Sequence, residues 1–87
     1  MASVHIPSLL QDLTGGADEV TAPGATVGEL IEALEERFPG LRDRLCDGRR
    51  LRPAVAVWVD GEPSREGLLQ ALTDHSDVHF LPAISGG

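Results

Sequence analysis

Lysine is absent from this sequence of 87 residues, and all seven basic residues are arginines. Fourteen acidic residues outnumber them, so the formal net charge at pH 7 is −7. Binding to nucleic acid or to an anionic membrane requires cationic side chains, so this charge balance argues against both kinds of partner. The absence of lysine also leaves no side-chain ammonium that could accept an isopeptide bond. We expect a protein partner with a basic surface.

Cysteine occurs once, as Cys46, which excludes an internal disulfide and a multi-cysteine metal site. Long apolar runs are absent as well, since the longest, residues 54–59, is far too short to cross a bilayer. Residues 1–5 lack the basic and apolar stretches of a secretory signal. These absences predict a cytoplasmic protein that does not enter a membrane.

Aromatic residues make up only 3% of the chain, whereas 41% of its residues are hydrophobic. The core must therefore consist of aliphatic side chains and alanine, with Phe38 and Phe80 as its larger members. A chain of this length supports one modest core. We expect a single domain over residues 1–87, in which residues 83–87 form a flexible tail ending in Gly-Gly.

Two strands are expected near the N-terminus. Residues 3–6 alternate polar and apolar side chains and are bounded by Pro7. Residues 19–22 follow the turn cluster Thr14-Gly15-Gly16. The two segments are expected to pair as a hairpin with a wide loop.

Two more strands are expected in the second half of the chain. Residues 54–59 are rich in β-branched side chains and end at Asp60-Gly61, a pair typical of hairpin turns. Residues 78–82 form an apolar segment that Pro82 should end, because proline cannot donate to a sheet ladder. Pro63 restricts the segment between them to an edge or a loop.

A helix is predicted to begin at Thr26 and to stop at Pro39-Gly40. Thr26 precedes Glu29 by three residues, which is the spacing of a capping box. The apolar residues that follow recur at spacings of three and four: Val27, Leu30, Ile31, Leu34 and Phe38. The acidic residues lie elsewhere on the helical wheel, as expected of a solvated face.

The stretch after the helix carries arginines and the single cysteine. Residues 41–46 are expected to form another helical turn, and residues 47–50 an exposed loop with Gly48 at its turn. No glycine-rich phosphate loop accompanies the arginines, so a phosphate site is not favoured. Cys46 is expected to be a small buried hydrophobe rather than a nucleophile, because local spacing places no histidine or acid beside it.

The order of elements predicts an α+β protein with one main helix on one face of a mixed sheet of four to five strands. Alternation points seven side chains toward the helix: Val4, Ile6, Val55, Val57, Val59, Val78 and Phe80. It points His5, Trp58, His79 and Leu81 to the opposite face. Such a group on an open face indicates a partner-docking surface, although Trp58 could equally pack beneath a loop.

The three histidines do not predict a metal site. His75 and His79 are four residues apart but fall on a turn and a strand, and His5 is distant in sequence. The remaining carboxylates are scattered, as a strongly acidic composition requires. We therefore expect neither a metal site nor a catalytic residue.

Residues 83–87, Ala83-Ile84-Ser85-Gly86-Gly87, are small and uncharged. Glycine has no Cβ, so the final pair can thread a narrow channel and leave the Gly87 carboxylate unhindered. Alone this is weak evidence, because many chain ends are rich in small residues. We expect Ala83, Ile84, Ser85 and Gly86 to thread a partner's active site and Gly87 to carry the reacting group.

These features resemble the ubiquitin-like sulfur-carrier family of β-grasp proteins, which includes MoaD, ThiS and CysO. The resemblance covers nearly the whole chain and is carried by five segments: residues 4–7, Thr14-Gly15-Gly16, Thr26-Val27-Gly28, Phe38-Pro39-Gly40 and residues 77–87. The Thr-Gly-Gly and the Leu-Pro-Ala of residues 81–83 are most similar to CysO-type carriers. The resemblance implies the β-grasp fold.

The resemblance also implies a carrier protein rather than an enzyme, with no bound cofactor. An E1-like adenylating enzyme of the MoeB/ThiF type would use ATP and Mg to adenylate the Gly87 carboxylate. Sulfide, or a persulfide from a sulfurtransferase, would then displace AMP and leave a thiocarboxylate. A downstream sulfur-accepting synthase would use it to make cysteine or another sulfur-containing metabolite.

Three alternatives remain open from the sequence. The chain could be the small subunit of molybdopterin synthase, which shares the same chemistry. It could be a ubiquitin-like protein modifier, although Ala83-Ile84-Ser85 lacks the arginines of the ubiquitin tail. It could also be a β-grasp interaction module whose tail is incidental, and deletion of Gly87 would separate this last reading from the others.

Overall fold

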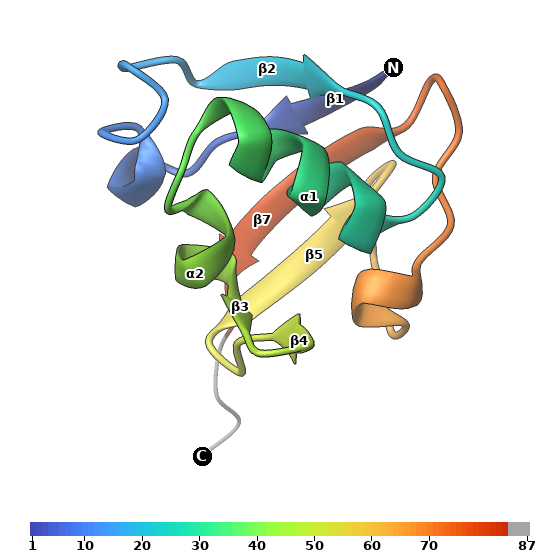
Figure 1. Cartoon of the computed structure of the whole chain (residues 1–87). Coiled ribbons are helices and arrows are strands. Elements are labelled where there is room, and N and C mark those ends of the chain that lie inside the picture. The colour runs from blue at the N-terminus through green and yellow to red at the C-terminus, as the bar shows by residue number, and fades with distance from the viewer. Residues whose placement is uncertain (84–87) are drawn as a thin grey trace.

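The structure, a computed structural model, describes residues 1–83 and consists of a twisted sheet with two helices on one face (Figure 1). The five strands of the main sheet lie in the order β2-β1-β7-β5-β6. Their bounds are β1 Ala2–His5, β2 Glu19–Ala22, β5 Val55–Val59, β6 Glu62–Pro63 and β7 Asp77–Pro82. The central pair β1 and β7 is parallel and the other pairs are antiparallel. The predicted α+β class and mixed sheet are confirmed.

The main helix α1, Val27–Arg37, begins and ends where the sequence predicts. The Thr26 hydroxyl accepts a hydrogen bond from the Glu29 backbone N–H at 3.2 Å, and the Glu29 carboxylate accepts one from Ala25 N–H at 3.3 Å. Gly24 precedes this cap with a φ of +151°, and a Cβ there would lie 2.6 Å from the Leu30 nitrogen. Only glycine therefore lets the chain approach the first turn so closely.

The segment between α1 and β5 is more regular than expected. Helix α2, Leu41–Leu45, is the predicted helical turn. The predicted loop over residues 47–50 is instead a small hairpin of β3, Cys46–Asp47, and β4, Arg50–Leu51, joined at Gly48 with a φ of 68°. Two short 3-10 helices, η1 at Ser8–Leu10 and η2 at Gly67–Leu69, complete the described chain.

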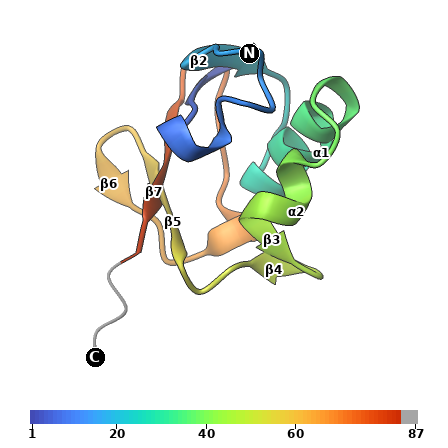
Figure 2. The same cartoon turned by 90° about the vertical axis from the view of Figure 1, so that its left-hand side faces the viewer.

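The core lies between the sheet and the two helices. Its contributors from α1 are Val27, Leu30, Ile31 and Leu34, and from the sheet and the residue after β1 they are Ala2, Val4, Ile6, Ala22, Val57, Val78 and Phe80. Val55 and Val59 are half-buried against it, as is Phe38 at the end of α1. In Figure 2 the helices and the β3–β4 hairpin lie on one side of the sheet, so the other face stays open among the described residues.

None of the helices within residues 1–83 has both the length and the apolar character needed to cross a bilayer. The longest of them is α1, which has 11 residues and a charged outer face. Its burial against the sheet explains its apolar stripe.

Glu35 connects α1 to α2. Its carboxylate accepts hydrogen bonds from the backbone N–H groups of Gly40, at 3.0 Å, and Arg42, at 2.8 Å, at the N-terminus of α2. These bonds, of which that from Gly40 has the larger effect, lower the pKa of Glu35 below its ordinary value of 4.5. Gly40, the N-cap residue of α2, has no side chain that could accept these hydrogen bonds. The ionised Glu35 carboxylate accepts them instead.

The stability of the fold should therefore depend on the ionisation of Glu35. Because its folded pKa is lowered, this contribution is complete above pH 4.5 and is lost as the pH falls through the folded value. We expect Glu35→Ala to lower the urea midpoint at pH 7, with the difference from the wild type shrinking below pH 4.5.

The neighbouring Glu36 offers a matched control, because its side chain is exposed and lies on the same helix. Glu36→Ala should leave the urea midpoint nearly unchanged. Equal midpoints for Glu35→Ala and the wild type at pH 7, or a difference that does not shrink as the pH falls below 4.5, would contradict the capping role.

Candidate functional site

The open face of the sheet carries one row of side chains that crosses four strands. The register pairs His5 of β1 with His79 of β7, and His79 with Trp58 of β5. Glu19 of β2 lies opposite His5 at one end of the row. Their neighbours along the strands, such as Val57, Val78 and Phe80, are buried on the other side. Three side chains predicted to share a face therefore lie side by side.

Leu81, the fourth predicted member, lies on the same face one step further along β7 and pairs with Ala56. Its side chain is 41% exposed, which makes it one of the few large apolar residues that reach solvent in the described chain. Trp58 is half-buried rather than fully exposed, with Pro63 of β6 as its other cross-strand neighbour. Docking of a partner on this face remains a prediction.

The sheet also brings together three groups that the sequence analysis did not connect. His5 Nε2 lies 2.5 Å from Asp77 Oδ1, and His79 Nε2 lies 3.3 Å from Asp77 Oδ2. The two imidazole rings are stacked, with centroids 3.9 Å apart and planes 5° from parallel. Sequence separation concealed this cluster, because only the parallel pairing of β1 with β7 makes His5 and His79 neighbours.

The carboxyl group of Asp77 is the centre of this cluster. Its hydrogen bond from His5 is the largest cause that lowers the pKa of Asp77, and the bond from His79 adds to it. The backbone of Asp77 is fixed by the β5–β6 turn: its N–H donates to Asp60 Oδ1 at 2.9 Å, and its carbonyl accepts from Asp60 N–H at 2.8 Å. Asp60 adopts a φ of 54° to make this turn with Gly61.

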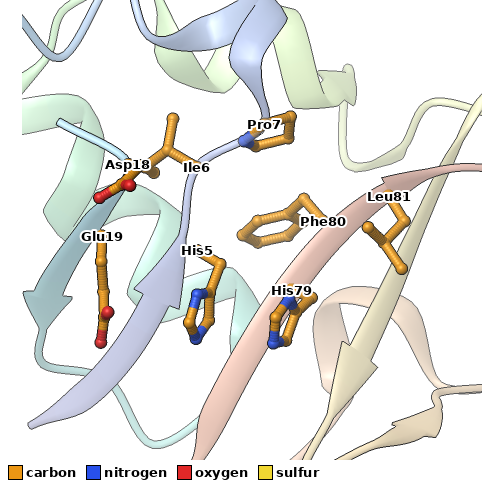
Figure 3. A pocket seen from close by; sticks show the side chains of 8 residues that line it. All are labelled: His5, Ile6, Pro7, Asp18, Glu19, His79, Phe80 and Leu81. Atoms are coloured by element: carbon orange, nitrogen blue, oxygen red, sulfur yellow. The ribbon is translucent and has the colours of Figure 1, made fainter. Parts of the chain in front are cut away.

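A shallow hollow of about 300 Å³ lies beside the histidine pair. Figure 3 shows the rings of His5 and His79 lying side by side from neighbouring strands, with the Glu19 side chain on the far side of His5. Asp18 also lines the hollow, and no arginine lines it among the described residues. The hollow therefore combines two imidazoles and two carboxylates with four apolar side chains.

The predicted tail follows directly from the strand that carries His79 and Leu81. Ala83, the first residue of the predicted tail, follows the end of β7 and is still held by a hydrogen bond, since its N–H donates to the Ala54 carbonyl at 2.8 Å. Ile84, Ser85, Gly86 and Gly87 lie outside the described residues. A second hollow of about 320 Å³, lined by Leu9, Leu81 and Pro82 among others, adjoins the point where β7 ends.

Cys46 begins β3 and is buried, with 6% of its surface exposed. Burial raises the pKa of its thiol, which keeps it protonated at neutral pH. The prediction that Cys46 is a small buried hydrophobe is confirmed.

Residues 4–87 match the ThiS family. The chain is 38% identical over 90 residues to the sulfur carrier protein CysO of Mycobacterium tuberculosis, covering 98% of this chain and 97% of that protein. It is 34% identical over 65 residues to small archaeal modifier protein 3 of Haloferax volcanii, covering 72% of this chain and 71% of that protein. It is 33% identical over 64 residues to the molybdopterin synthase sulfur carrier subunit of M. tuberculosis, covering 74% and 66%.

Solved structures agree with the sequence relatives. A crystal structure of the BexX/CysO complex of Amycolatopsis orientalis contains a chain with a TM-score of 0.92 and 37% identity, and the match covers 100% of both chains. The crystal structure of M. tuberculosis CysO has a TM-score of 0.90 and 36% identity over 97% of this chain and 100% of that one. The β-grasp fold expected from the sequence is confirmed.

Replacing a large side chain by alanine should lower the free energy of unfolding less on the open face than in the core. Trp58 is half-buried and Phe80 is 2% exposed. We expect Trp58→Ala to lower the free energy of unfolding by about 1 kcal/mol, against about 3–5 kcal/mol for Phe80→Ala, as measured by urea denaturation. An equal loss in the two variants would place Trp58 in the core and remove the argument for a free docking face.

Proposed function

This chain belongs to the ThiS family, and we propose that it is a sulfur carrier whose Gly87 carboxylate is converted to a thiocarboxylate. The observation that carries the proposal is the family match, which continues through Gly86 and Gly87. The full-length similarity to CysO carriers supports it. These relatives are carriers rather than enzymes, so the catalytic groups belong to partner proteins.

The proposed chemistry has two steps on the Gly87 carboxyl group, which is ionised at neutral pH. A carboxylate oxygen attacks the α-phosphorus of ATP and pyrophosphate leaves, giving an acyl-adenylate. Hydrosulfide then attacks the carbonyl carbon, the bond to AMP breaks, and a thiocarboxylate remains. With a persulfide donor, attack gives an acyl disulfide that a thiol reduces to the same product. Gly86 and Gly87 favour both attacks because they place no side chain near the carbon.

The proposed partners are an E1-like adenylating enzyme, a sulfide or sulfurtransferase source, and a downstream synthase that accepts the sulfur. ATP and Mg would be bound by the adenylating enzyme, and the carrier would need no cofactor of its own. A solved complex of BexX with CysO supports a protein partner for this chain. The row from His5 to Trp58, together with Leu81, is the proposed docking face because two of its members, His79 and Leu81, lie on β7, the strand that leads to the tail.

The destination of the sulfur is proposed to be cysteine or another sulfur-containing metabolite. CysO relatives match this chain over almost its whole length, whereas the molybdopterin synthase sulfur carrier subunit matches about three quarters of it. Conjugation to proteins is the second candidate, because this chain is also 34% identical to a small archaeal modifier protein over 72% of its length. The adenylation step is common to both candidates.

Intact-mass spectrometry tests the carrier proposal directly. The purified chain is incubated with ATP, Mg, sulfide and an E1-like enzyme from the same cell, beside a variant that lacks Gly87. We expect the wild type to gain the mass difference between sulfur and oxygen and the deletion variant to stay unchanged. No mass gain with any such enzyme of that cell would refute the carrier role, and adducts to other proteins would favour the modifier.

The docking face is tested by binding of the same adenylating enzyme. Trp58→Ala should weaken that binding by about tenfold or more, because central aromatic residues dominate interface energies. Leu69→Ala is the control, since Leu69 is 80% exposed on η2, which packs against α1 on the helix side. Equal affinities for Trp58→Ala and the wild type, or a comparable loss in Leu69→Ala, would contradict the assignment of the face.

A further inference from the structure

The cluster of His5, Asp77 and His79 has the donor atoms of a metal site. One ligand atom from each residue can be chosen so that all three lie within 4.8 Å of one another. A tetrahedral zinc ion with bonds of about 2.0–2.2 Å separates neighbouring ligand atoms by about 3.4 Å. The separation of His79 Nε2 from Asp77 Oδ2, 3.3 Å, is close to this value, and that of His5 Nε2 from Asp77 Oδ1, 2.5 Å, is well below it and would have to lengthen. Because the two rings are stacked and 5° from parallel, the imidazoles must rotate out of the stack for both Nε2 atoms to face one ion.

The backbone holds this cluster in place. His5 and His79 are direct neighbours across the parallel pair, and Asp77 pairs with Ser3 two residues before them. Asp60 fixes the Asp77 backbone through two hydrogen bonds, and Ser3 N–H donates to the Ser76 carbonyl at 3.0 Å. Ligands mounted on central strands lose little freedom on binding, which favours a pre-formed site.

The surroundings also favour a cation. The side chains of His5, His79 and Asp77 are 34%, 36% and 48% exposed, so an ion can enter and keep a coordination position open to water. Asp18 and Glu19 line the adjoining hollow, and the chain carries a net charge of −7. An acidic surface raises the local concentration of cations.

We propose that His5, Asp77 and His79 bind a divalent transition-metal ion of the zinc type on the open face of the sheet. Two imidazole nitrogens and one carboxylate oxygen are the ligand set that such ions prefer, whereas Mg²⁺ and Ca²⁺ prefer oxygen alone. To bind the metal, each Nε2 must be free of its proton, which a neutral imidazole then carries on Nδ1 and an imidazolium releases to solvent. The proposal goes beyond the carrier function and does not involve Gly87.

Calorimetric titration of the metal-free chain with ZnCl₂ tests the site, with MgCl₂ as the ion control. We expect saturable binding of one Zn²⁺ per chain, no binding of Mg²⁺, and a loss of affinity of at least about tenfold in His5→Asn, His79→Asn and Asp77→Asn. His75→Asn is the matched control, because His75 is exposed and lies outside the cluster. It should bind Zn²⁺ as the wild type does.

A spectroscopic measurement on the unaltered protein removes any dependence on folding of the variants. The ¹⁵N resonances of the His5 and His79 Nε2 atoms should shift together as Zn²⁺ is added, while those of His75 stay in place. Absence of saturable Zn²⁺ binding, shifts confined to His75, or loss of binding on deletion of Gly87 would overturn the proposal. None of these outcomes affects the mass test of the carrier function.

Discussion

The parallel pairing of β1 with β7 is the constraint on which the rest of the structure depends. It joins the first and the last strands of the described chain at the centre of the sheet. Parallel neighbours cannot be connected by a tight turn, so the intervening chain must leave the sheet and return. Helix α1 makes that crossover, and its apolar stripe covers one face. The core, the open face and the histidine pair all follow from this pairing.

The two faces of the sheet have different physical characters. One is sealed by α1 and α2, with aliphatic side chains and Phe80 filling the space. The other presents imidazoles, an indole and carboxylates, and no helix of the described residues covers it. The strand that displays His79 and Leu81 leads to Ala83, so the open face adjoins the last residue that the structure describes.

Local patterns in the sequence were sufficient to predict most of the helices and strands of the fold. The capping box at Thr26 and the alternation in residues 54–59 are short-range signals, and both produced the expected elements. The β3–β4 hairpin was missed because two-residue strands leave no periodic pattern. The His5–Asp77–His79 cluster was also missed, since it requires the register of two strands from opposite ends of the chain. Whether the open face docks a partner is not encoded in the fold alone.

Trp58 is the only tryptophan, and the sequence contains no tyrosine, so the near-ultraviolet emission of this protein comes from one indole. That indole is half-buried on the open face, across from His79. Any event that covers the face or changes the state of the neighbouring imidazole should alter its fluorescence. Trp58 fluorescence therefore reports directly on the open face of the sheet. Binding at that face can be followed in real time without a label.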